Sequence, residues 1–116
     1  MNQEMSEGRL RARRKQVQRS AQEAVRNDFS SIIAQIRSEK NLMGNGKRMV
    51  VVRFVAPRGY GITGFWEYYE SYKEHLITAL PDDFLVGEES CIPPDGNISI
   101  KWDADLPLTQ TTFSRS

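Results

Sequence analysis

A run of cations near the N-terminus offers the clearest chemistry in the sequence. Within GRLRARRKQVQRS, residues 8–20, five cations occupy seven consecutive positions, and further arginines follow. Guanidinium and ammonium groups bind phosphate oxygens, so the run predicts contacts to the phosphates of RNA or DNA. The predicted nucleic-acid-binding residues are Arg9, Arg11, Arg13, Arg14, Lys15, Arg19 and Arg26.

The basic run is a local excess, because the formal net charge of the 116-residue chain is only +1. Residues 1–40 carry nine Lys and Arg side chains against five Asp and Glu, whereas residues 41–116 carry seven against ten. This segregation indicates a basic arm that meets a negative partner: nucleic acid, a membrane surface, or the acidic part of this protein or of a second copy. The segment RARRK also fits a nuclear-import signal.

Catalytic chemistry is much less evident than phosphate binding. The loop PRGYGITG, residues 57–64, has neither the spacing of a dinucleotide fingerprint nor the Lys-Ser/Thr ending of a phosphate loop. His75 has no nucleophile at a recognisable spacing, and Cys91 has no adjacent cation to favour its thiolate. One Cys and one His cannot build a Cys-rich zinc site. We therefore expect a non-enzymatic protein with no cofactor and no metal.

The basic run lies on the strongest helical pattern in the chain. From about Arg9 to Lys40, apolar residues recur at spacings of three and four, as on one face of a helix. The stripe shifts around the helix near Asn27, and Asp28 has the side chain to cap a new helix there. The pattern predicts two helices or one bent helix. The apolar positions are Leu10, Val17, Ala21, Ala24, Val25, Phe29, Ile32, Ile33 and Ile36.

Four of the cations gather opposite the stripe that Val17 and Ala21 define. We call Arg11, Lys15, Arg19 and Arg26 the basic face; they lie within about 80° of one another on a helical wheel and span about 22 Å along the axis. That length would follow several phosphates of a duplex. Two alternatives remain: a surface helix that only carries solvated charge, or pairing with glutamates of a later helix, namely Glu67, Glu70 and Glu74.

The remainder of the chain predicts a small sheet with one further helix. A run of β-branched residues, Arg48 to Ala56, is typical of a central strand covered on both faces. A helix capped by Thr63 is expected from about Gly64 to Leu80. Two shorter strands follow, at about Phe84 to Glu88 and Asn97 to Trp102, and the alternation in the latter indicates a half-exposed strand.

These elements predict the α+β class: one or two N-terminal amphipathic helices, then a small β-α-β-β unit with a mixed or antiparallel sheet. We expect a single domain at residues 9–106, with a flexible N-terminus at 1–8 and a flexible tail at 107–116. No apolar run approaches the roughly 20 residues that span a bilayer, so no membrane is expected. The lack of a secretory signal and the lone Cys91 predict an intracellular protein, cytoplasmic or nuclear.

The function expected from the sequence is non-enzymatic binding of RNA or DNA, mainly through backbone contacts, as in an accessory protein of a virus, phage or mobile element. The alternative is a protein-interaction adaptor or assembly subunit, a homo-oligomer formed through its N-terminal helices. The residues assigned to this self-association are Leu10, Val17, Ala21, Ala24 and Val25.

One short tail motif predicts a protein partner. Thr109-Gln110-Thr111 resembles the TQT anchor that adds as a strand to the dynein light chain hub, although Pro107 stands where many such anchors carry a lysine. The resemblance covers three residues and implies strand addition, in which backbone hydrogen bonds supply affinity.

Overall fold

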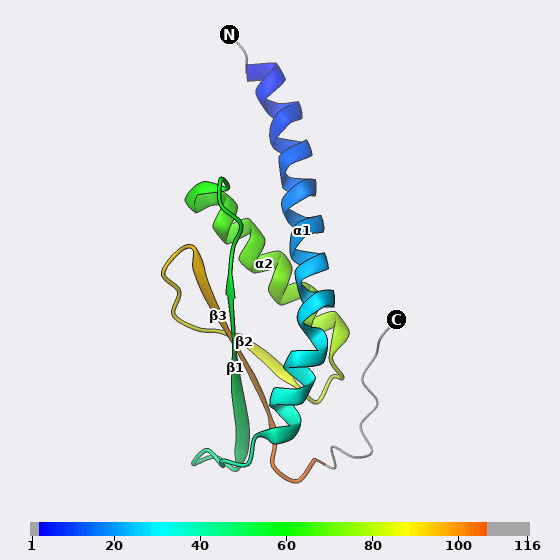
Figure 1. The fold of residues 1–116 in the computed structure, drawn as a ribbon, viewed down its shortest axis with the longest axis vertical. Coiled ribbons are helices and arrows are strands. Elements are labelled where there is room, and N and C mark those ends of the chain that lie inside the picture. Colours follow the sequence, from blue (N-terminus) through cyan, green and yellow to red (C-terminus); the bar gives the residue numbers. More distant parts are fainter. Residues whose placement is uncertain (1–2, 107–116) are drawn as a thin grey trace.

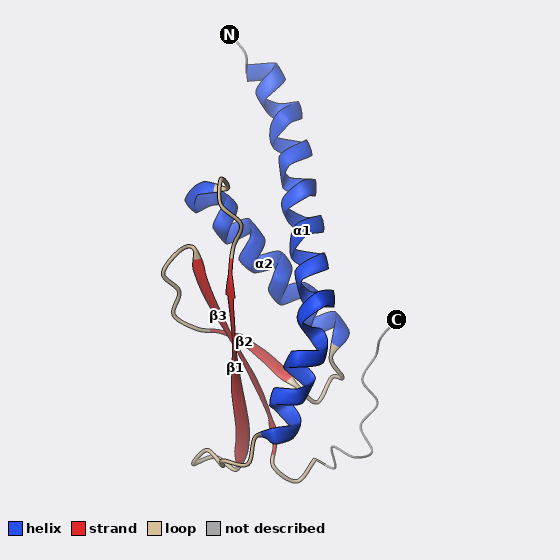
Figure 2. Cartoon of the chain, in the orientation of Figure 1, coloured by secondary structure: helices blue, strands red, loops and turns tan. Residues whose placement is uncertain are grey.

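A computed structural model describes residues 3–106, with side chains from Gly8 onward. The elements follow the order α1 (Gln3–Ser38), β1 (Lys47–Val55), α2 (Gly61–Ala79), β2 (Leu85–Glu88) and β3 (Asp95–Asp103) (Figure 1). The three strands form one antiparallel sheet, and both helices pack on the same face of it (Figure 2). The predicted α+β class is confirmed. The tail motif Thr109-Gln110-Thr111 lies outside the described residues.

α1 is one continuous helix, so the two-helix alternative is wrong. It begins at Gln3 and therefore includes residues that the sequence analysis placed in a flexible N-terminus. Figure 1 shows α1 curving along its length, which agrees with the one-bent-helix alternative. Asp28 caps nothing; its carboxylate accepts a hydrogen bond from α2 instead. The apolar stripe shifts around the helix, and the curvature keeps it on the core side, because a long helix bends around the core that it covers.

The strand order β1-β3-β2 reverses the expected roles of two strands. β1 was predicted to be central, but it is an edge strand whose residues alternate between the core and solvent. Val50 and Val52 are buried, whereas Val51 and Val55 are exposed. β3 was predicted to be half-exposed, but it pairs on both sides and buries even Ser99. A run of β-branched residues fits either role, and only the pairing partners decide between them.

α2 begins earlier than the sequence predicts. Its N-cap is Tyr60, without a side-chain cap, and Thr63 lies inside the first turn. Gly59 and Gly61 adopt positive φ values of 93° and 70°, which side-chain-bearing residues rarely tolerate. These glycines turn the chain directly from β1 into α2, which explains the early start.

An aromatic cluster attaches α2 to the sheet. The ring of Phe54 on β1 stacks on Tyr72 with centroids 4.5 Å apart, and Tyr68 and Tyr69 pack around it. Trp102 on β3 is buried against Phe84. Each such ring stabilises the fold by roughly 1.5 to 3 kcal/mol through burial. α2 is thereby fixed on the sheet. α1 packs against α2 and buries Val17, Ala21, Val25, Ile32 and Ile36 in the same core.

Candidate nucleic-acid interface

The N-terminal turns of α1 extend past the end of α2 and past the sheet (Figure 1). At 1.5 Å per residue, a helix of 36 residues is about 54 Å long. The molecule measures 59 × 30 × 19 Å, so α1 alone accounts for its long dimension. The basic run therefore begins on a projecting helical arm and continues onto the part of α1 that packs against α2.

Two of the predicted cations attach the arm to α2. The Arg13 guanidinium donates a hydrogen bond to the carbonyl oxygen of Tyr60, the N-cap of α2. The Arg14 Nε lies 3.7 Å from a carboxylate oxygen of Glu67. This ion pair is solvent-exposed and contributes about 0 to 1 kcal/mol, so it sets orientation more than strength. Arg13 and Arg14 are thus partly engaged inside the molecule.

The other five predicted cations point to solvent. Arg9, Arg11, Lys15, Arg19 and Arg26 are all exposed. Among residues 8–106, whose side chains are described, none of the five forms an ion pair. Within the part of the chain that the structure describes, all four residues of the basic face are therefore exposed and free of ion pairs.

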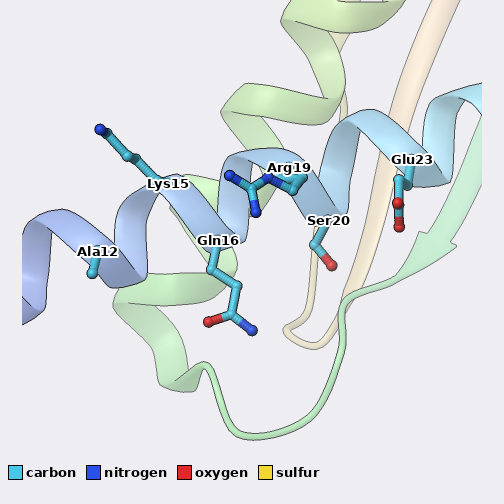
Figure 3. Close-up of a pocket in the computed structure, with 6 residues that line it drawn as sticks. All are labelled: Ala12, Lys15, Gln16, Arg19, Ser20 and Glu23. Carbon is cyan, nitrogen blue, oxygen red and sulfur yellow. The ribbon is translucent and has the colours of Figure 1, made fainter.

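Figure 3 shows the middle of this surface in detail. Lys15 and Arg19 extend from successive turns of α1, with Gln16 and Ser20 beside them and Glu23 one turn further. All the residues that line this hollow come from one helix, so the surface is shallow and suits an extended polyanion better than an enclosed small molecule. Glu23 is an acidic neighbour of these cations, and its position next to them is not among the features predicted from the sequence.

No family model, curated protein or solved structure matches this chain.

Among residues 8–106, the glutamates of α2 form no ion pair with the cations of the basic face. Glu67, Glu70 and Glu74 line a groove between α2 and α1, beside the half-exposed Trp66. Within residues 8–106, Arg14 is the only cation of α1 paired with any of them, and Glu70 pairs with Lys73 at 3.3 Å. Internal neutralisation, one of the two alternatives to phosphate binding, therefore involves Arg14 and not the basic face.

The proposed self-association stripe is largely covered by the protomer itself. Val17, Ala21 and Val25 are buried in the core beneath α2, and Ala24 is partly buried. Leu10 is the exception, with 54% of its surface exposed on the arm. The sequence predicts an interface at this stripe because the stripe is longer than a small sheet and one further helix would be expected to cover. α2 nevertheless covers most of it, since it crosses α1 along the packed half.

Cys91, which was considered for catalysis, has a structural role in a loop. The Cys91 sulfur accepts a hydrogen bond from the Asn97 amide at 3.3 Å and lies in the connection between β2 and β3. Tyr69 donates to the Asn97 carbonyl at 2.8 Å and accepts from the Glu89 amide at 3.2 Å, which holds the same connection.

Across the described residues, no group of three or more His, Cys, Asp or Glu side chains is placed to hold a metal ion. Neither described helix combines the length and apolarity needed to cross a membrane.

Proposed function

We propose that the protein binds RNA or DNA through the phosphate backbone, using the exposed cations of α1. The observation that carries this proposal is a difference between cations of the same basic run: some contact α2, and the others are exposed to solvent. Arg13 and Arg14 contact α2, whereas Arg9, Arg11, Lys15 and Arg19 are exposed to solvent and have no ion-pair partners among residues 8–106. A cluster of unpaired like charges is unfavourable in isolation and becomes favourable when a polyanion neutralises it.

The spacing of the cations supports contacts along a strand or duplex. Arg11, Lys15 and Arg19 lie about one helical turn apart, Arg26 follows about two turns later, and the set spans about 22 Å. Each neutralised phosphate releases condensed counterions, which supplies affinity that depends on salt and not on base sequence. We therefore propose backbone binding with little sequence preference.

The test compares two double variants of equal charge change. Arg11→Ala/Lys15→Ala removes two cations of the basic face. Arg37→Ala/Lys40→Ala removes two exposed cations near the far end of α1, about 39 Å from Arg11 along the helix axis. Binding is measured for single- and double-stranded RNA and DNA across a salt series. We expect only the first variant to weaken binding and to reduce the logarithmic salt slope, by about 0.7 to 0.9 for each lost contact.

A quadruple variant decides between this function and the adaptor alternative. Replacing Arg11, Lys15, Arg19 and Arg26 by Ala leaves the packed residues of α1 untouched, so circular dichroism should show an unchanged helix content. If this variant binds all four nucleic acids as tightly as the parent at low salt, phosphate binding by the basic face is excluded. The adaptor function would then be preferred.

A further inference from the structure

The outer edge of β1 carries a row of unpaired backbone groups. The β1–β3 ladder pairs residues such as Val50 with Ile100. At its two ends, the Ala56 amide donates to Pro94 at 2.8 Å and the Ala104 amide donates to Gly46 at 3.2 Å. In an antiparallel ladder the hydrogen-bonded pairs alternate, so the even-numbered residues of β1 direct their N–H and C=O groups toward β3. The odd-numbered residues direct theirs outward.

The open part of this edge has defined ends. The Lys47 carbonyl accepts from the Met43 amide at 2.6 Å, and its own amide donates to Asn45 Oδ1 at 3.1 Å. The loop before β1 therefore closes that end, and beyond Val55 the chain reaches Pro57, which has no N–H. Among residues 3–106, no hydrogen bond engages the outward backbone groups of the remaining four residues. These are Met49, Val51, Arg53 and Val55, which we call the open edge.

We propose that the open edge pairs with the same edge of a second copy, forming an antiparallel β1–β1 ladder about a two-fold axis at Val52. A two-fold axis there places Met49 opposite Val55 of the partner subunit and Val51 opposite Arg53 of the partner subunit. Every residue of the open edge is then used, and Lys47, which is already satisfied, is left out. An exposed, apolar edge strand of this length otherwise favours uncontrolled association.

The side chains favour a second copy over an unrelated peptide. In this register Arg53 faces an aliphatic residue and not another cation, and its charge is held by Asp95 of its own chain at 3.7 Å. Val51 and Val55, which are 42% and 61% exposed, become cross-strand neighbours of the partner's edge residues. A single ladder of this size buries less area than a standard stable interface, so we expect a dimer that forms at micromolar or higher concentrations.

Hydrogen exchange of the unmodified protein tests the proposal directly. The amides of Val50, Val52 and Phe54 lie in the intramolecular ladder, so their protection should not depend on protein concentration. The amides of Met49, Val51, Arg53 and Val55 should exchange rapidly in dilute solution and become protected as the concentration rises. Sedimentation velocity on the same samples should show a monomer–dimer equilibrium. Fast exchange of all four amides at the highest concentration, with a monomer in the centrifuge, would overturn the proposal.

Charge substitutions at Val51 test the register. Because Val51 lies opposite Arg53 of the partner subunit, Val51→Lys should weaken the dimer roughly 5- to 20-fold, and Val51→Glu should strengthen it by a similar factor. Leu85→Lys is the control, because it adds the same charge at an exposed position of β2, away from this edge. Equal effects of Val51→Lys and Val51→Glu would reject this register. Protection of the open edge only in the presence of another protein would assign the edge to that partner instead.

Discussion

The Tyr72 hydroxyl on α2 donates a hydrogen bond of 2.9 Å to the Asp28 carboxylate in the middle of α1. Tyr72 is fully buried, and its ring stacks on Phe54 of β1. The contact therefore joins the long helix to α2 and, through Phe54, to the sheet. It also explains how an acidic residue is accommodated on the packed side of α1, because a polar group at a buried surface needs a partner.

Tyr72→Phe should lower the free energy of unfolding by about 1 to 2 kcal/mol, because the half-buried Asp28 carboxylate loses its donor while the ring packing remains. Urea denaturation measures the change. Tyr60→Phe is the matched control, since the Tyr60 hydroxyl forms no hydrogen bond among the described residues. Equal losses in the two variants would show that the Asp28 contact contributes nothing specific.

The stability of the protein should fall at alkaline pH. Burial, with the negative charge of Asp28 adding to its effect, raises the pKa of Tyr68 to about 12. Burial also raises the pKa of Tyr69 to about 12, and burial and the Asp28 hydrogen bond raise the pKa of Tyr72 further. Because the folded state favours the neutral phenols, their contribution is complete below the ordinary tyrosine pKa of 10.0 and is lost as the pH rises above it.

Urea midpoints measured from neutral pH to about pH 12 test this dependence, with phenolate absorbance reporting ionisation. Tyr72→Phe should show a shallower alkaline loss than the parent, because one of the three phenols is absent. A midpoint that stays constant across this range would contradict the expected ionisation linkage.

Gly96→Ala should be strongly destabilising. A methyl group at this position of β3 would lie 2.4 Å from the Phe54 ring, which is held between α2 and the sheet. Relieving that overlap must displace the aromatic cluster, at a cost of about 1 to 3 kcal/mol or more. Gly44→Ala is the control, because an added methyl group there meets nothing within 4 Å. Thermal unfolding should show a lowered Tm for the first variant only.

Glu23→Gln should strengthen nucleic-acid binding at low salt. Glu23 lies within the hollow that Lys15 and Arg19 line, so its charge repels phosphates at that surface (Figure 3). Removing one exposed charge should improve affinity by up to about fivefold, and the gain should disappear as salt screens the interaction. Glu74→Gln, an equal charge change at an exposed position of α2, is the control. The basic face would not be the binding surface if both variants gained equally.

Sequence periodicity is most informative about α1. A helical face repeats over three and four residues, so the buried positions Val17, Ala21, Ile32 and Ile36 can be read from local spacing. The same wheel correctly places Arg11 and Lys15 on the exposed side. The partners of Arg13 and Arg14 cannot be read this way. Tyr60 and Glu67 are distant in sequence and meet α1 only after α2 has packed.

The sequence by itself determined the helix, its basic face and the α+β class, because these follow from interactions between near neighbours along the chain. Only the tertiary structure decided that β1 lies at the edge, that β3 is central and that Asp28 faces Tyr72. A β-branched strand satisfies local preferences equally well at the centre or edge of a sheet. Its position depends on which distant strand supplies the hydrogen bonds, and in the fold the central strand contributes Ile98, Ile100 and Trp102 to the same core as the aromatic residues of α2.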